Sequence, residues 1–184
     1  MYHEAIQHLR KGDILLYPSD TTWDLGCDAR NEKAVDSLIN LKQRSDNEIF
    51  TILISKIEQL SEYVTEVPEI AWNLVEFAEK PLTVIYPKGK SLPSNLMGAD
   101  GSIAIRLVKD EFCKGLIYKF ERGIVSTSAN ISGQLSPTKF DDISSVIIEG
   151  VDYILHNPKG ESKNIQASQI IKLGLDFGFE FIRK

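Results

Sequence analysis

The sequence has few of the side chains from which metal and thiol sites are built. It holds two cysteines and three histidines, namely Cys27, Cys113, His3, His8 and His156. Neither a zinc-ligand spacing nor a Cys-x-x-Cys motif occurs among them, so the sequence indicates neither a structural zinc site nor a dithiol redox centre. We therefore expect both thiols to be reduced and buried.

Long apolar runs and an excess of basic residues are also lacking. No stretch reaches the roughly 18 apolar residues of a membrane-spanning helix, and no basic region followed by an apolar run opens the chain. The 21 basic and 26 acidic residues give a net charge of −5, so RNA binding through a broad basic face is not indicated, and any phosphate site must be local. We expect a cytoplasmic protein that does not contact membranes.

Several familiar catalytic patterns are absent. Neither the Walker phosphate-binding pattern nor the dinucleotide-binding fingerprint occurs. A Ser/His/Asp triad has no assignment, because His156 is the one histidine outside the first predicted helix, and no cluster of carboxylates suggests a fixed metal site. What remains is a set of cations and neutral hydrogen-bonding side chains. Such a set suits positioning and charge stabilisation in transfer to a phosphorus centre, where Mg²⁺ usually arrives with the nucleotide.

Hydrophobic periodicity predicts an α/β fold in a single domain over residues 1–184, because 42% apolar content supports one sizeable core. Strands are predicted over 13–17, 50–54, 81–86, 102–107, 124–125 and 151–155, with a terminal hairpin of 166–172 and 178–182. Helices are predicted up to Gly12, from Asn31 to Arg44, over 57–63, from Pro68, over 113–120 and from Pro137. Residues 18–26 are predicted as a loop. Strands and helices alternate early and strands pair late, which favours a mixed sheet.

Residues 123–133, Gly-Ile-Val-Ser-Thr-Ser-Ala-Asn-Ile-Ser-Gly, carry five hydrogen-bonding side chains within seven residues at a predicted strand end. Open α/β sheets bind ligands at such ends, where many neutral donors and acceptors would be useful. The same composition also suits a surface turn that bonds its own backbone. The segment alone leaves both interpretations open.

Three cations stand at the ends of predicted elements. Lys42 and Arg44 lie two apart, so an ideal helix would point them about 200° from each other, and they could share a ligand only at a fraying end. They either bind phosphates or complement the helix dipole at about 0.3–1 kcal/mol each, and their position alone favours the dipole. At a solvated helix end they should contribute little to folding. Arg106 ends an apolar strand, so it needs a substrate carboxylate or an Asp on a neighbouring loop.

Six segments, in order along the chain, resemble the threonylcarbamoyl-AMP synthases with the YrdC-like fold. They are residues 17–28 (YPSDTTWDLGCD), 41–44 (LKQR), 81–85 (PLTVI), 103–106 (IAIR), 126–133 (STSANISG) and 167–170 (ASQI) with a terminal 181–183 (FIR). Each segment is a weak signal alone, and together they span nearly the whole chain. The resemblance implies a twisted mixed parallel and antiparallel sheet with flanking helices and a concave cationic groove.

The resemblance also implies a nucleotidyltransferase that joins L-threonine, bicarbonate and ATP to give threonylcarbamoyl-AMP and pyrophosphate. This is the first step towards N6-threonylcarbamoyladenosine in tRNA. Mg²⁺ would come with ATP rather than occupy a fixed protein site, and the product would be handed to a threonylcarbamoyl transferase complex.

The family pattern implies site residues at matching positions of this sequence. The implied threonine-binding residues are Thr21, Arg106, Ser128 and Ser168. The implied ATP-binding residues are Lys42, Arg44, Asn130, Ser136, Thr138 and Arg183, and Lys42 and Arg44 are also the catalytic candidates. Ser128 and Asn130 are expected to orient substrates rather than act as nucleophiles, since no general base for Ser128 is evident in the sequence.

The chain departs from the family pattern at three places. Trp23-Asp24 stands where the family usually has Tyr-Gly, Ser45 stands where a Pro follows the Lys-x-Arg pair, and Lys80-Pro81 stands where Gly-Pro precedes the Leu-Thr strand. Asp24 adds a side chain and a negative charge near the expected phosphates. These departures keep two alternatives open: a YciO-like paralogue, or an RNA- or nucleotide-binding module, each with the same fold and without synthase activity.

Overall fold

The computed structural model describes residues 2–44, 50–160, 167–174 and 178–184. Its strands are β1 Leu15–Pro18, β2 Trp23–Asp28, β3 Thr51–Ile54, β4 Leu82–Tyr86, β5 Ile103–Leu107, β6 Ile124–Ser128, β7 Tyr153–Ile154, β8 Gln169–Leu173 and β9 Phe179–Arg183. Its α-helices are α1 His3–Lys11, α2 Glu32–Lys42, α3 Leu60–Tyr63, α4 Glu69–Phe77, α5 Glu111–Phe120 and α6 Ser145–Gly150, with short 3-10 helices η1 Ile57–Gln59, η2 Ser94–Leu96 and η3 Phe140–Asp142.

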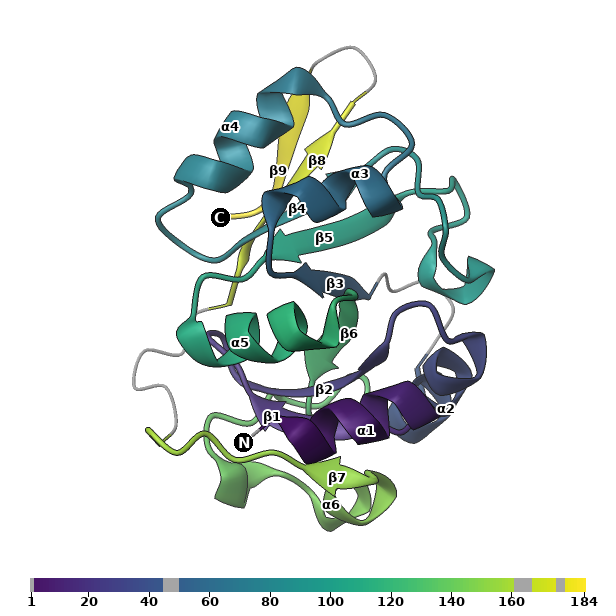
Figure 1. Ribbon diagram of the computed structural model, residues 1–184, viewed down its shortest axis with the longest axis vertical. Coiled ribbons are helices and arrows are strands. Elements are labelled where there is room, and N and C mark those ends of the chain that lie inside the picture. Colours follow the sequence, from purple (N-terminus) through teal and green to yellow (C-terminus); the bar gives the residue numbers. More distant parts are fainter. Residues whose placement is uncertain (1, 45–49, 161–166, 175–177) are drawn as a thin grey trace.

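The strands of the described residues form one nine-stranded sheet in the order β7-β1-β2-β6-β3-β5-β4-β8-β9 (Figure 1). Neighbours run parallel in the pairs β1–β7, β3–β5 and β4–β8, and antiparallel in the other five pairs. The mixed sheet predicted from the sequence is confirmed, and so is the antiparallel hairpin at its end, formed by β8 and β9. Residues 166 and 175–177 of the predicted hairpin lie outside the described residues.

Two clusters of buried apolar side chains lie on opposite faces of this sheet. Successive residues of a strand point to opposite faces, and accordingly Leu16 belongs to one cluster while Leu15 and Tyr17 belong to the other. Helices α1 and α5 cover the second cluster, with Leu9 and Leu116 fully buried between them and the sheet. Figure 1 shows these two helices on the same side of the sheet.

Helix ends follow the signals in the sequence. Gly12 ends α1 with φ 90°, a left-handed conformation that favours glycine. The side chain of Asn31 accepts a hydrogen bond from the Ala34 amide at 3.2 Å and so caps α2. Pro68 stands directly before α4, where its missing N–H matters little. These three predicted boundaries are confirmed.

The prediction of a loop over residues 18–26 was wrong in its second half. Ser19 to Thr22 form a tight turn in which the Ser19 amide donates to the Thr22 carbonyl at 2.8 Å, and β2 starts at Trp23. Every residue of β2 is buried, including Asp24. A strand covered on both faces has no alternation of polar and apolar residues, so the pattern that reveals half-buried strands was absent.

The single helix predicted from Pro137 is divided into η3 and α6. Asp142 accepts three hydrogen bonds on one carboxylate oxygen, from the hydroxyl and amide of Thr138 and from the amide of Lys139. This local bonding closes a short turn before a regular helix can begin, and Ser144 then stands at the start of α6.

None of the helices within the described residues is both long and apolar enough to cross a membrane.

The two cysteines are free and fully buried, as expected from the sequence. Burial raises the pKa of Cys27 and of Cys113, so the reactive thiolate form is scarce in the folded protein. We expect neither thiol to be alkylated by iodoacetamide at about pH 8 in the folded protein, and both to be alkylated after unfolding in guanidinium. Intact mass spectrometry measures this, and alkylation of the folded protein at the rate of a free thiol would contradict it.

Candidate functional site

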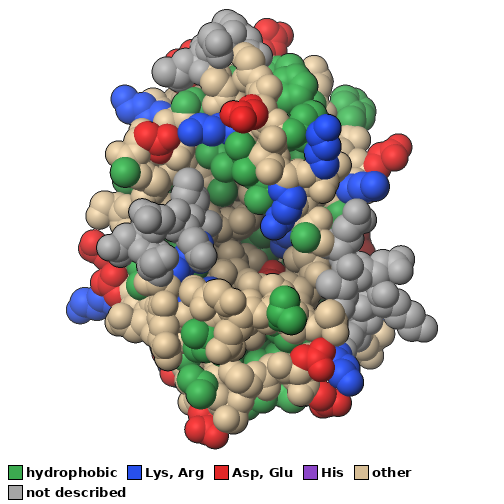
Figure 2. All heavy atoms as spheres, turned by 180° about the vertical axis from the view of Figure 1, so that it is seen from behind, with side chains coloured by type: hydrophobic (Ala, Val, Ile, Leu, Met, Phe, Trp, Pro, Cys, Tyr) green, Lys and Arg blue, Asp and Glu red, His purple; other side chains and the backbone are tan. Residues whose placement is uncertain are grey.

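A polar cavity of about 390 Å³ opens where β2, β5 and β6 meet the terminal hairpin. We call it the central cavity, and it is lined by Thr21, Thr22, Asp24, Thr51, Arg106, Ser126, Thr127, Ser128, Ser136, Pro137, Thr138, Ala167, Ser168, Ile170 and Arg183. Figure 2 shows the molecule from behind relative to Figure 1, with a hollow near the middle of this face and basic side chains beside it. The described lining is rich in hydroxyl groups and carries charge at Asp24, Arg106 and Arg183.

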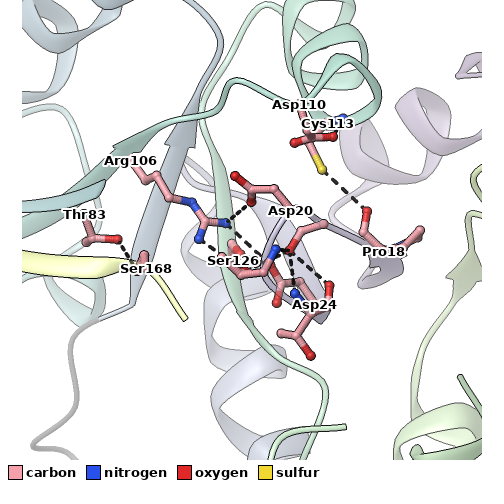
Figure 3. A network of polar contacts seen from close by, with 12 residues as sticks. Pro18, Asp20, Asp24, Thr83, Arg106, Asp110, Cys113, Ser126 and Ser168 are labelled. Atoms are coloured by element: carbon pink, nitrogen blue, oxygen red, sulfur yellow. Dashed lines mark hydrogen bonds and ion pairs between the residues drawn. The ribbon is translucent and has the colours of Figure 1, made fainter. Parts of the chain in front are cut away.

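Arg106 is the buried cation of this cavity. It lies on β5, its side chain is 5% exposed, and its Nη2 lies 3.3 Å from Asp20 Oδ1 and 3.8 Å from Asp24 Oδ2. Its Nη1 donates to Thr21 Oγ1 at 3.3 Å. Figure 3 shows the guanidinium pointing at the turn between β1 and β2. An Asp on a neighbouring loop is thus present beside Arg106, and the substrate carboxylate stays a prediction.

Asp24 is a buried carboxylate on β2, in register opposite Ser128 of β6. Its Oδ2 accepts a hydrogen bond from Ser126 Oγ at 2.7 Å. Burial raises the pKa of Asp24 above its ordinary value, while the Arg106 charge and the Ser126 hydroxyl act in the opposite direction. Strands β2 and β6 lie close together two residues further on, because a Cβ atom at Gly26 would come within 2.6 Å of the Val125 carbonyl.

Ser168 joins the terminal hairpin to the rest of the site. Its hydroxyl lies 2.9 Å from Thr83 Oγ1 on β4, and it accepts a hydrogen bond from Arg183 Nη2 at 3.1 Å. Arg183 Nε also donates to the Ser168 carbonyl at 2.8 Å. Burial and the nearby Arg106 charge lower the pKa of Arg183, and both guanidiniums belong to the cavity lining.

Lys42 differs from the solvated cation expected from the sequence. Its residue is 2% exposed, and its ammonium donates to the carbonyls of Ser128 at 2.6 Å and of Asn130 at 2.8 Å. Lys42 is the last residue of α2, and the left-handed Gln43 that follows, with φ 51°, turns the chain away from the helix axis. The expectation of a fully solvated pair was therefore wrong for Lys42, because the helix end packs against the segment after β6.

The comparisons with known proteins decide the family. The family model Sua5_yciO_yrdC, described as Telomere recombination, matches residues 7–184. The chain belongs to this family. Its curated relatives include the threonylcarbamoyl-AMP synthase of Acinetobacter baumannii, 31% identical over 175 residues that cover 91% of each chain. The threonylcarbamoyl-AMP synthase of Pseudoalteromonas translucida is 31% identical over 169 residues, which cover 90% of this chain and 89% of the relative.

Solved structures of the Sua5/YciO/YrdC family share the fold. P. abyssi Sua5 complexed with L-threonine superposes with a TM-score of 0.85 at 31% identity, covering 92% of this chain and 50% of that chain. The present chain thus spans about half the length of that protein. E. coli YciO superposes with a TM-score of 0.84 at 24% identity, covering 98% of this chain and 87% of that chain, and this likeness bears on the fold alone.

In this Sua5/YciO/YrdC family member, most of the site residues implied by the sequence meet in one place. The predicted residues that line the central cavity are Thr21, Arg106, Ser128, Ser136, Thr138, Ser168 and Arg183. The cationic character of the groove as a whole stays a prediction, because Asp24 brings a negative charge to the same lining. Among the described residues, no group of three or more His, Cys, Asp or Glu side chains is placed to hold a metal ion.

Three predicted residues lie beside the central cavity lining rather than in it. Lys42 bonds the segment after β6, as described above. The guanidinium of Arg44 lies over the Phe50 ring, 3.8 Å from its centroid. The amide of Asn130 donates to the carbonyls of Ile131 and Gln134 at 3.0 and 2.9 Å. Both interpretations of residues 123–133 therefore hold in part, because the strand end lines the cavity and the turn after it bonds its own backbone.

Sequence reasoning did not assign Thr51 to the site, and it included Ser126 and Thr127 only as hydrogen-bonding members of residues 123–133. Thr51 begins β3 and pairs in register with Ser126 of β6, and all three residues line the cavity. The available signal was a polar residue at the edge of each of two apolar strands. That signal gains meaning only when β3 and β6 are known to be neighbours, and pairing between strands far apart in the sequence cannot be read from periodicity.

Proposed function

We propose that this chain is a threonylcarbamoyl-AMP synthase, which joins L-threonine, bicarbonate and ATP to give threonylcarbamoyl-AMP and pyrophosphate. The observation that carries the proposal is a buried arginine, Arg106, which lies with Thr21 in one polar cavity. Curated relatives that are 31% identical to this chain are named threonylcarbamoyl-AMP synthase. The product would serve the first step towards N6-threonylcarbamoyladenosine in tRNA.

The cavity lining supplies separate groups for the two substrates. Arg106 offers two guanidinium nitrogens that suit the carboxylate of threonine, and the hydroxyls of Thr21, Ser128 and Ser168 surround the same space. Arg183 and the loop carrying Ser136 and Thr138 line the same cavity, and we assign them to ATP. Lys42 and Arg44, the catalytic candidates, are assigned to the phosphates together with Asn130.

The reaction needs positioning more than covalent catalysis. The threonine amine and bicarbonate form a carbamate with loss of water, and a carbamate oxygen then attacks the α-phosphorus of ATP. The bond to the β-phosphate breaks, and pyrophosphate leaves. No enzyme nucleophile is needed, so Ser128 orients a substrate, and nearby cations stabilise the charge that develops on the phosphates.

We further propose that Mg²⁺ enters with ATP, because nucleoside triphosphates bind this ion through their phosphate oxygens. The product is an activated acyl adenylate that water can hydrolyse. Hand-over to a threonylcarbamoyl transferase complex would protect it, and this partner is part of the proposal.

Mass spectrometry of a reaction mixture tests the proposal. Purified protein, ATP, Mg²⁺, threonine and ¹³C-labelled bicarbonate should give threonylcarbamoyl-AMP that carries the label, and omission of threonine or ATP should abolish it. Binding of ATP without product in the complete mixture would overturn the synthase and favour the YciO-like alternative. Binding of RNA with steep salt dependence, again without product, would favour the binding module.

Replacing Arg183 by glutamine is expected to raise the Kd for ATP at least roughly tenfold, equivalent to about 1.4 kcal/mol. The guanidinium bonds Ser168 at the cavity and adds positive charge beside Arg106. The melting temperature without ligand should change little, because Arg183 is exposed and water can replace its two hydrogen bonds to Ser168. Calorimetry with ATP measures the effect, and Lys184→Ala is the matched control. An Arg183 variant that binds ATP as tightly as this control would remove Arg183 from the ATP site.

A further inference from the structure

The central cavity holds a positive and a negative charge side by side. Asp24 Oδ2 lies 3.8 Å from Arg106 Nη2, and the two side chains are 4% and 5% exposed. Both residues line the cavity, together with Thr21 and Ser126. Figure 3 shows the Arg106 side chain directed towards Asp20 and Asp24.

Asp24 is the second carboxylate beside Arg106. Asp20 already lies closer to the guanidinium, at 3.3 Å, and reaches it from the turn between β1 and β2. The Asp24 carboxylate is instead fixed by the shorter contact with the Ser126 hydroxyl, at 2.7 Å. Burying a second carboxylate here is unfavourable unless another group uses it.

A cavity that received only anions would gain nothing from Asp24. A carboxylate or phosphate bound to Arg106 would come close to Asp24 and be repelled by it. A zwitterion has no such conflict, because an α-amino acid carries an ammonium and a carboxylate separated by about 2.5 Å across one carbon. It can lie along the Asp24 and Arg106 pair with each of its charges facing the opposite one.

We propose that Asp24 and Arg106 together form a zwitterion subsite for the incoming α-amino acid, in which Asp24 accepts a hydrogen bond from its ammonium, before the amine becomes a carbamate, while Arg106 binds its carboxylate. This inference rests on the proposed function and adds a specificity-determining residue to it. Ser126 is a positioning residue, since it holds the Asp24 carboxylate without contacting the ligand in this arrangement. The subsite discriminates against acids that lack the amine.

Two ligands of nearly equal size test this discrimination without ATP. L-Threonine and (R)-3-hydroxybutanoate share the carboxylate, the hydroxyl and the methyl group, and differ in the amine. Calorimetric titration of the wild-type protein should show threonine binding at least roughly tenfold more tightly. Asp24→Asn should remove most of this preference, because the variant should bind threonine more weakly and the hydroxy acid more tightly than the wild type does. The variant keeps the shape of the side chain and removes its charge.

Asp28→Asn is the matched control, because Asp28 is also a buried carboxylate of β2 with an arginine partner, Arg122 at 3.0 Å, and it does not line the cavity. It should retain the wild-type preference for threonine. A thermal melt checks that both variants are folded. If Asp24→Asn does not fold, the wild-type ratio alone still decides, since equal affinity for the two ligands contradicts the subsite.

The remaining outcomes separate the subsite from the synthase activity. Threonine binding that depends on Asp24, without formation of threonylcarbamoyl-AMP, supports the subsite and overturns the proposed function. Binding of serine or glycine in place of threonine, with the same dependence on Asp24, supports the subsite and changes the substrate. An unchanged ligand ratio in Asp24→Asn, or no binding of any of these amino acids to the wild type, overturns the subsite.

Discussion

Replacing Lys42 by alanine is expected to lower both the stability of the protein and its rate of synthesis. The ammonium donates to the carbonyls of Ser128 and Asn130 at 2.6 and 2.8 Å, and hydrogen bonds from charged donors are worth about 1.5–3 kcal/mol each. We expect a loss of roughly 3 kcal/mol in the free energy of unfolding, measured by urea denaturation. Synthesis should fall on the order of 100-fold, because Ser128 and Asn130 would no longer be held in place and the proposed contact of Lys42 with the phosphates would be lost.

Two further variants separate the roles of this segment. Lys42→Met keeps the aliphatic chain and loses the charge, so it should lose nearly as much stability as alanine. Arg44→Ala removes a stacking contact with the buried Phe50 ring, worth on the order of 1 kcal/mol. It should also reduce synthesis on the order of 100-fold if Arg44 binds the phosphates. A Lys42→Ala protein with wild-type stability would show that the two carbonyl contacts contribute nothing.

Replacing Arg106 by glutamine should have an even larger effect on folding. The substitution leaves Asp20 and Asp24 without the cation that faces both of them. Removal of one partner from a buried ion pair typically costs about 3–5 kcal/mol. Threonine binding should fall on the order of 100-fold, since the group proposed to hold the carboxylate is lost. Arg106→Lys keeps the positive charge but lacks the two parallel N–H donors of the guanidinium. Compared with Arg106→Gln, it should therefore restore the free energy of unfolding more than the affinity for threonine.

The stability loss in Arg106→Gln should depend on pH in a defined direction. In the wild type, burial already raises the pKa of Asp24 above the ordinary value of 3.8, and Arg106 opposes this rise. Without Arg106 the folded-state pKa rises further, so the folded protein favours the protonated carboxyl. The free energy of unfolding of Arg106→Gln should therefore fall furthest below that of the wild type at about pH 7. The gap should be smaller near pH 4, where the Asp24 carboxyl is increasingly protonated. A difference independent of pH would contradict an ionised Asp24.

Local rules predicted much of the framework. The cap at Asn31, the glycine at Gly12 and the helix start after Pro68 each depend on a few neighbouring residues, and the sequence therefore contains the whole signal. The hairpin of β8 and β9 is also local. By contrast, β2 is buried on both faces and gives no alternation, and the turn of Asp142 onto Thr138 competes with helix formation in a way that propensity does not capture.

The sequence predicted which residues belong to the site better than it predicted the contacts between them. The resemblance placed seven of its residues in what proved to be one cavity, whereas periodicity alone could not have joined Arg106 to Thr21, which lies 85 residues away. For the same reason, Lys42 looked like a solvated helix end, because its partner Ser128 is 86 residues distant. Asp24 was recognised as unusual, but its contact with Ser126 depends on the pairing of β2 with β6, which no local pattern contains.

The strand order has a consequence for folding kinetics. The cavity combines β2, β3, β5, β6, β8 and β9. The same sheet includes contacts such as that of the Ile14 amide with Asp152, 138 residues away. Pairings of this kind form slowly, because a long loop must close before any contact stabilises it. No short contiguous fragment contains the whole cavity. We therefore expect recovery of ligand binding during refolding to follow pairing of the strands that line the cavity, and recovery of helical signal to come earlier.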